Sequence, residues 1–138
     1  MAQQSEPPPP APWEWTTLGG LHFFGPTRAS ILFGGGLRRK GPAADARVRL
    51  LFAAAEPGFG ALRLSAGYAE SVGPLAGGWS LRSSLIELTR PEGNPRYAGL
   101  EAQLLPAVCL GLRLGAFRSL ERGGRSGTLL LADFSMCL

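Results

Sequence analysis

Several features that would place this sequence in a familiar class are missing. No stretch approaches the roughly 18 to 20 consecutive apolar residues that a membrane-spanning helix needs, and charged residues make up only 17% of the chain. Histidine occurs once and cysteine twice, at spacings that match no metal-ligand pattern. We therefore expect neither a helical membrane protein nor a metal site, and no motif indicates a cofactor.

The positive charge lacks the clustering that nucleic-acid binding requires. The net charge of +4 comes mostly from arginines that stand singly along the chain, apart from Arg38-Arg39-Lys40. The glycines at 34–36 are not followed by the Lys-Ser/Thr of a phosphate-binding loop, and they do not open a helix. A nucleic-acid partner is therefore not expected.

The first residues also lack a secretory signal, because Met1 to Glu6 contain neither a basic nor an apolar segment. Either the protein is cytosolic, or a signal peptide has been removed and Met1 added for expression. Ala2 to Ser5 is typical of residues that follow a signal-peptidase cut, so we favour the second explanation. Residues 1–12 contain four consecutive prolines and are expected to form a disordered, Pro-rich leader to a barrel domain at 13–138.

What the sequence has in abundance is turn formers between short apolar runs. Its 20 glycines and 12 prolines exceed the usual shares. They separate eight runs: 13–24, 28–38, 46–55, 61–70, 79–89, 97–105, 109–119 and 128–138. This even spacing is typical of all-β proteins, and a helical period is absent. Because most separators are short, neighbouring runs should pair as hairpins, which predicts a closed up-and-down antiparallel β-barrel of about eight strands.

Most runs alternate between an apolar face and a face of small or charged residues. The apolar faces include Val48/Leu50/Phe52/Ala54, Leu62/Leu64/Ala66/Tyr68, Ala98/Leu100/Ala102/Leu104 and Leu110/Leu112/Leu114/Ala116. The last run has a wholly apolar face that ends at Leu138. The run 79–89 mixes both characters on each face, and we expect a β-bulge there.

This alternation is compatible with two barrels that are inside-out versions of each other. In a soluble barrel the apolar face fills the interior, whereas in a membrane barrel it meets lipid and the polar face lines the lumen. Small residues around the charges, uncharged apolar faces over four positions, and aromatics at the starts of runs favour the membrane barrel. The interfacial aromatics on this interpretation are Trp13, Trp15, Trp79 and Tyr97.

The last hairpin indicates a specific register. If it is centred on Gly123, Arg113 faces Asp133 and Cys109 faces Cys137. A disulfide between adjacent strands needs the close Cβ atoms of a non-hydrogen-bonded pair. A disulfide here would be consistent with an oxidising compartment such as the periplasm or outer membrane. The alternative is two buried thiols that never meet, and both remain open.

On the membrane interpretation, charged side chains face a water-poor lumen. Buried charge is costly unless it is paired, so these side chains should form a connected salt-bridge network that fills the bore and blocks a channel. The predicted members are Arg49, Arg63, Arg82, Glu101, Arg113 and Asp133. On the soluble interpretation the same residues form a solvated surface with no role.

The single histidine provides the catalytic candidate of the sequence. Pairing about Pro26 would place His22 opposite Ser30, as a base beside a nucleophile. No third group that would orient the histidine can be identified, so a catalytic site is not predicted.

The chain from Trp13 to Leu138 resembles the small eight-stranded outer-membrane barrels of the OmpA-domain and OmpX kind. The resemblance rests on the number of strands, their alternating faces, the aromatic residues at the ends of strands and the final Phe134-x-Met136-x-Leu138. The resemblance implies a monomer in the bacterial outer membrane that contacts lipid and is recognised by the barrel-assembly machinery through its closing strand. The chain departs from the pattern in ending on Leu138 rather than the usual Phe. Its short loops argue against adhesion or receptor roles.

The leading hypothesis is therefore a transmembrane barrel with a structural or interaction role rather than an enzyme. One alternative is a soluble lipocalin-like barrel that binds an apolar ligand inside. The other is a lipid A-modifying outer-membrane enzyme, although lipid A deacylases place a His and a Ser near their C-terminal strands, where this chain has no histidine.

Overall fold

The computed structural model describes residues 11–137 except 24–27, 43–46, 73–75, 108–109 and 122–126. The predicted leader at 1–12 therefore lies outside the described residues, apart from Ala11 and Pro12. Within the described part of the chain no helix is long and apolar enough to cross a membrane.

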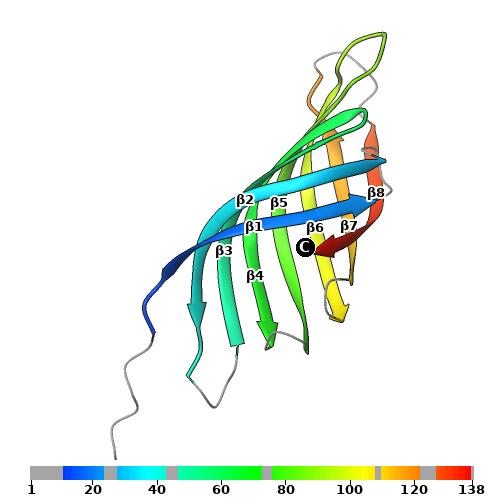
Figure 1. Ribbon diagram of the computed structural model, residues 1–138. Helices are drawn as coiled ribbons and strands as arrows, with labels where there is room; N and C mark the ends of the chain where they lie inside the picture. Colours follow the sequence, from blue (N-terminus) through cyan, green and yellow to red (C-terminus); the bar gives the residue numbers. More distant parts are fainter. Residues whose placement is uncertain are drawn as a thin grey trace, which may run out of the picture.

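The described chain forms one closed ring of antiparallel strands (Figure 1). The strands are β1 (Glu14–Phe23), β2 (Ala29–Lys40), β3 (Arg47–Gly58), β4 (Ala61–Val72), β5 (Ala76–Leu88), β6 (Arg96–Ala107), β7 (Leu110–Ser119) and β8 (Thr128–Cys137). Each strand pairs with the next along the chain, and β8 returns to pair with β1. The predicted up-and-down β-barrel is thus confirmed. We call the end where β1 begins and β8 ends the N/C end, and the other the distal end.

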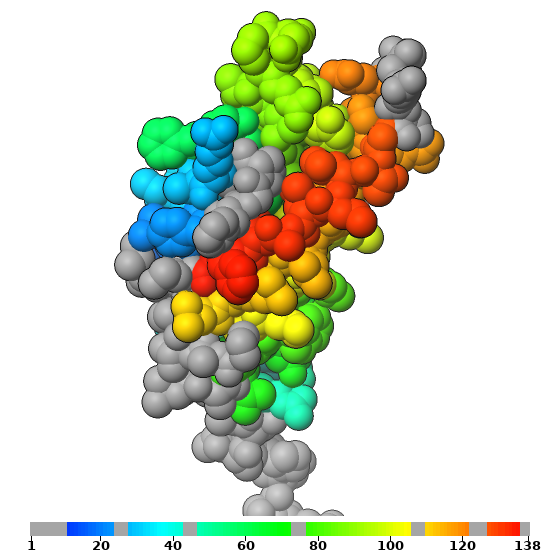
Figure 2. Space-filling model, turned by 90° about the vertical axis from the view of Figure 1, so that its right-hand side faces the viewer, coloured from blue at the N-terminus to red at the C-terminus, as the bar shows by residue number. Residues whose placement is uncertain are grey.

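The ring closes through a short seam in which Gly20 to Phe23 of β1 face Cys137 to Phe134 of β8. Figure 2 shows β8, in red and orange-red, running obliquely across one face of the barrel. On β7 and β8 the register is the one predicted about Gly123: Gly111 faces Ser135 and Arg113 faces Asp133.

The outer surface of the ring carries most of the large apolar side chains. Leu100 of β6 is 70% exposed and Leu130 of β8 is 75% exposed. Along both strands exposed side chains alternate with inward ones, which include the buried Glu101 and Asp133. Other exposed apolar residues around the ring are Ile31, Phe33, Leu51, Leu64, Leu81, Leu104, Leu114 and Phe134. The outward faces predicted for 61–70, 97–105 and 109–119 are therefore found on β4, β6 and β7, and that of 128–138 is found on β8 as far as Phe134. The side chains of Met136 and Leu138 lie outside the described residues.

Strand β3 has the opposite orientation to the one predicted. Phe52 and Ala54 are buried, whereas Leu51 is 48% exposed. The strand's inward face continues to Glu56, which is fully buried in the lumen, and strict alternation along β3 then directs Arg49 outward. The prediction that the apolar face of β3 points outward was wrong because the lumen beside the first half of β3 is lined by apolar side chains.

Strand β5 alternates without the predicted bulge. Its pairing with β6 is continuous from Gly78 to Glu87, and the irregularity in its pairing with β4 lies at Ser71/Val72, outside 79–89. The mixed pattern arises because Ile86 and Leu88 turn inward near the distal end.

The interior has three layers along the bore. At the distal end an apolar cluster is formed by Ala61, Ile86, Leu88 and Phe117, with Tyr97, Leu129 and Leu131 packed against it. Charged side chains fill the middle, and an apolar-walled cavity lies toward the N/C end. On the outer surface, Gly35 leaves room for the ring of Trp15, because a Cβ at Gly35 would overlap that ring.

Candidate functional site

The middle of the lumen holds a cluster of six buried charged residues. They are Glu56 of β3, Arg63 of β4, Arg82 of β5, Glu101 of β6, Arg113 of β7 and Asp133 of β8. We call these six residues the lumen charge cluster. Their formal charges cancel, and each is at most 6% exposed. One side chain from each of six successive strands meets on the axis because all six occupy inward positions of the ring.

Arg113 is the centre of the cluster. Its Nε and Nη2 donate to Asp133 Oδ1 at 2.7 Å and Oδ2 at 2.8 Å. Its Nη1 and Nη2 also donate to Glu56 Oε1 at 2.6 Å and Oε2 at 3.0 Å. One guanidinium therefore binds two carboxylates in the bidentate geometry that makes such pairs strong.

Arg63 links the remaining carboxylate to this centre. Its Nη1 lies 3.0 Å from Asp133 Oδ2, 3.5 Å from Glu56 Oε2 and 3.4 Å from Glu101 Oε1. Glu101 also accepts a hydrogen bond from the hydroxyl of Ser84. The cluster is thus a single connected network, and its members Arg63, Arg113, Glu56, Glu101 and Asp133 are among the largest fully buried side chains.

Arg82 forms the boundary between the cluster and the cavity. Its Nη1 is 3.8 Å from Glu56 Oε1, and its guanidinium carbon lies 5.1 Å from the centre of the Phe52 ring. Its Nη2 donates to Ser80 Oγ at 3.0 Å and to the side-chain oxygen of Gln103. Gln103 in turn donates through Nε2 to Ser135 Oγ at 2.6 Å.

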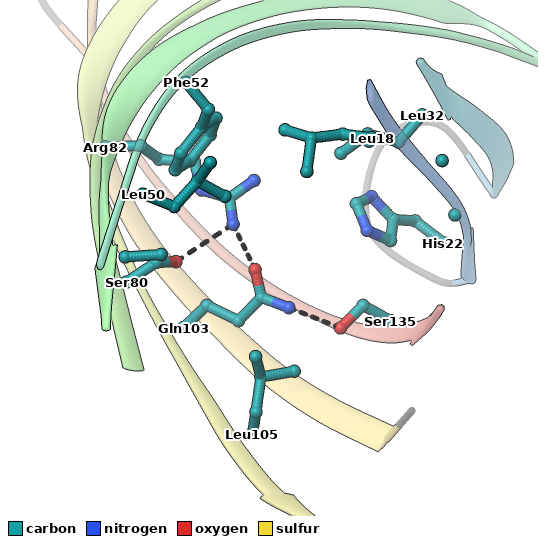
Figure 3. Close-up of a pocket in the computed structure, with 13 residues that line it drawn as sticks. Leu18, His22, Leu32, Leu50, Phe52, Ser80, Arg82, Gln103, Leu105 and Ser135 are labelled. Carbon is teal, nitrogen blue, oxygen red and sulfur yellow. Dashed lines mark hydrogen bonds between the residues drawn. The ribbon is translucent and has the colours of Figure 1, made fainter. Parts of the chain in front are cut away.

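The cavity next to Arg82 has a volume of about 150 Å³. Figure 3 shows a chain of hydrogen-bonded polar side chains along the cavity, from Arg82 through Gln103 to Ser135. His22 projects into the cavity from the wall opposite Arg82. The apolar lining comes from Leu18, Leu32, Leu50, Phe52 and Leu105.

His22 is joined to the lumen charge cluster. Its Nδ1 lies 2.6 Å from Glu56 Oε2, and the histidine is only 4% exposed. In the register, Ser30 and Ser135 flank His22 on the two neighbouring strands. The carboxylate of Glu56 therefore lies beside His22, a contact that the sequence did not predict.

Of the six residues predicted for the lumen network, the structure brings five together: Arg63, Arg82, Glu101, Arg113 and Asp133. The placement of Arg49 was wrong. Its side chain is 48% exposed and its Nε lies 3.9 Å from Glu70 Oε2 on the outer surface, because the orientation of β3 is set by Glu56. Glu56 is not among the predicted members because Pro57 and Gly58 are typical of a turn, so that the predicted run 46–55 ends one residue before it.

The predicted interfacial aromatics separate into two groups. Trp13, Trp15 and Trp79 are 42%, 70% and 40% exposed and lie at the N/C end. Trp79 also contacts Tyr68, with ring centres 5.6 Å apart. Tyr97 was wrongly placed, because it packs against the distal apolar cluster inside the barrel.

The predicted disulfide stays a prediction. Cys109 lies outside the described residues, and of Cys137 the structure describes the backbone pairing with Gly20 of β1. Among the described residues no group of His, Cys, Asp and Glu side chains is arranged to hold a metal ion.

Comparison with known proteins provides no relative. No family model, no curated protein and no solved structure matches this chain. The function is therefore argued from the geometry of the barrel.

Proposed function

We propose that this protein is a small transmembrane β-barrel of the bacterial outer membrane, with a plugged lumen and a structural or interaction role. The observation that carries the proposal is the distribution of side chains. Large apolar residues such as Leu100, at 70% exposure, cover the outside, while the six charges of the lumen charge cluster are at most 6% exposed.

A water-soluble barrel would favour the reverse distribution. Contiguous exposed apolar surface is rare on soluble monomers, and ionised groups are buried only when they are paired. A membrane barrel has an outward apolar band, a polar interior and aromatic residues at the interfaces. Closure of the ring supports the same conclusion, because pairing of strand edges satisfies backbone groups that lipid cannot solvate.

The lumen charge cluster favours a plugged barrel over a pore. Arg63 and Glu56 are 0% exposed, and Arg113 and Asp133 are 1% exposed. A layer of such side chains leaves no water-filled path through the described middle of the bore. The ion pairs that fill this layer join side chains from six strands.

The test is folding from urea into detergent micelles, followed by electrophoresis with and without boiling. We expect a β-rich species whose mobility changes on heating and which forms only when detergent is present. A stable, monomeric β-sheet protein in plain buffer would contradict the proposal and would favour the soluble barrel that binds an apolar ligand.

A second candidate function is a hydrolase acting on acyl esters, and a specific observation favours it. His22 Nδ1 contacts Glu56 at 2.6 Å, while Ser30 and Ser135 are its register partners. A serine, a histidine and a carboxylate are the components of a hydrolytic triad. We rank it second because Glu56 also binds Arg113 through both oxygens, which is what a structural ion pair requires.

The hydrolase is tested with p-nitrophenyl butyrate and with lipid A as substrates. Turnover that is lost in Ser30→Ala or Ser135→Ala and in His22→Gln, with the heat-dependent mobility unchanged, would establish it. Equal background rates in all four proteins would remove it.

A further inference from the structure

Two arginines lie side by side on the outer surface at the N/C end, and the folding of the barrel does not require this pairing of like charges. Arg39 of β2 and Arg49 of β3 are direct register partners. Both point outward, since they lie two positions from Leu37 and Leu51, which are also partners and are 43% and 48% exposed. Like charges placed directly opposite each other destabilise a sheet. An anion between the two guanidinium groups would remove that repulsion.

The described neighbours compensate this charge only in part. The guanidinium carbon of Arg39 lies 6.0 Å from the centre of the Trp13 ring, which is a cation–π contact and supplies no negative charge. Arg49 Nε is 3.9 Å from Glu70 Oε2. Glu70 is already engaged, because it lies 3.3 Å from Arg47 Nη1 and accepts a hydrogen bond of 3.0 Å from Tyr68.

The surroundings indicate which kind of anion fits. On one side of the pair lies the exposed apolar surface of Leu37, Leu51 and Trp15. On the other side β2 ends at Lys40 and β3 begins at Arg47, at the lower left of the barrel in Figure 1. A ligand on the outer surface here meets two arginines at its head and an apolar face along its length.

We infer that Arg39, Arg49 and Trp13 form a binding site for the phosphate headgroup of an anionic phospholipid in the membrane leaflet at the N/C end. Guanidinium groups bind phosphate in a bidentate manner, and tryptophan prefers the headgroup level. A net negative headgroup is favoured over a zwitterionic one because, among the described contacts, Arg39 faces only the Trp13 ring and Arg49 shares Glu70 with Arg47. This inference rests on the proposed membrane location.

The distal end provides a matched control. Arg96 is also exposed, at 64% of its side chain, but its Nε donates to Glu87 Oε2 at 2.6 Å. Its charge is therefore compensated by a carboxylate of its own, and removing it should leave lipid preference unchanged.

The test uses the full chain in lipid nanodiscs that contain equal amounts of phosphatidylglycerol and phosphatidylcholine. Lipids that remain bound after transfer to detergent are counted by native mass spectrometry. We expect retention of phosphatidylglycerol over phosphatidylcholine, and a loss of preference of about fivefold for each arginine replaced in Arg39→Gln and Arg49→Gln. Arg96→Gln should keep the preference of the unmodified protein.

Three results would overturn the inference. They are equal retention of both lipids, an equal loss of preference in Arg96→Gln, and binding of free glycerol 3-phosphate as strong as binding of the lipid. Failure of the protein to enter nanodiscs as a heat-modifiable barrel would overturn the membrane proposal and the lipid site together. A barrel that inserts but shows no lipid preference would overturn the lipid site alone.

Discussion

Arg113 and Asp133 face each other across β7 and β8 and are joined by two hydrogen bonds, of 2.7 Å and 2.8 Å, at the centre of the barrel. Both are 1% exposed. The pair links the closing hairpin to Glu56 and Arg63, and through them to β3 and β4. Loss of one partner therefore leaves a charge uncompensated where water does not reach.

Asp133→Ala is expected to lower the free energy of unfolding by about 3–5 kcal/mol, because breaking a buried pair strands its partner. Glu87→Ala removes the exposed ion pair with Arg96 and should cost less than about 1 kcal/mol. Urea unfolding in lipid vesicles, followed by tryptophan fluorescence, measures both. Equal effects would show that the lumen charge cluster does not stabilise the barrel.

Replacing both members of the pair should cost less than the sum of the single replacements. In Arg113→Met/Asp133→Leu no buried charge of the pair remains, although Glu56 loses its bidentate partner. A double-mutant cycle should show a coupling energy between Arg113 and Asp133 of about 0.5–3 kcal/mol. Strict additivity of the two single effects would mean that their hydrogen bonds carry no net energy.

A charge placed on the outer surface should change the stability of a membrane barrel and of a water-soluble barrel in opposite directions. Leu100→Arg adds a charge to the middle of the apolar band, and we expect it to destabilise a membrane barrel by about 2–4 kcal/mol. Leu120→Arg lies beyond the end of β7, where the residue is 53% exposed, and should cost about 0–1 kcal/mol. In a water-soluble barrel Leu100→Arg would be neutral or stabilising.

The cysteine prediction follows from the register of β7 and β8. Gly111 pairs with Ser135 and Leu110 with Met136, as a hairpin centred on Gly123 requires. We expect protein folded under oxidising conditions to resist alkylation at Cys109 and Cys137 until a reductant is added. Mass spectrometry of the intact alkylated protein distinguishes this result from two free thiols, which would exclude the disulfide.

Much of the fold follows from alternation and turn formers alone. The outward faces of β4, β6, β7 and β8 and the Arg113–Asp133 pairing are found where the sequence predicts them. The errors have a common cause. Leu50, Phe52, Ile86 and Tyr97 are apolar or aromatic but turn inward, because apolar side chains also line the lumen on either side of its charged middle layer. A rule that assigns apolar faces to lipid cannot detect apolar layers at the two ends of a bore.

The site was harder to predict because it depends on contacts between distant strands. The contact between His22 and Glu56 joins residues 34 positions apart, and no local pattern relates β1 to β3. Glu56 could have been found by extending the run 46–55 through Pro57, since Glu56 pairs with Arg63 in the hairpin of β3 and β4. That pairing would also have directed Arg49 to the outside.

The most direct test of the account is the environment of the outward face. A nitroxide label is placed at Leu100→Cys, with Cys109 and Cys137 changed to alanine, and its collision rates with oxygen and with a polar nickel complex are measured in lipid vesicles. The account predicts high access to oxygen and little access to nickel at this position, and high access to nickel at Leu120→Cys. Ready access of the nickel complex to position 100 would place the apolar face in water and contradict the membrane barrel.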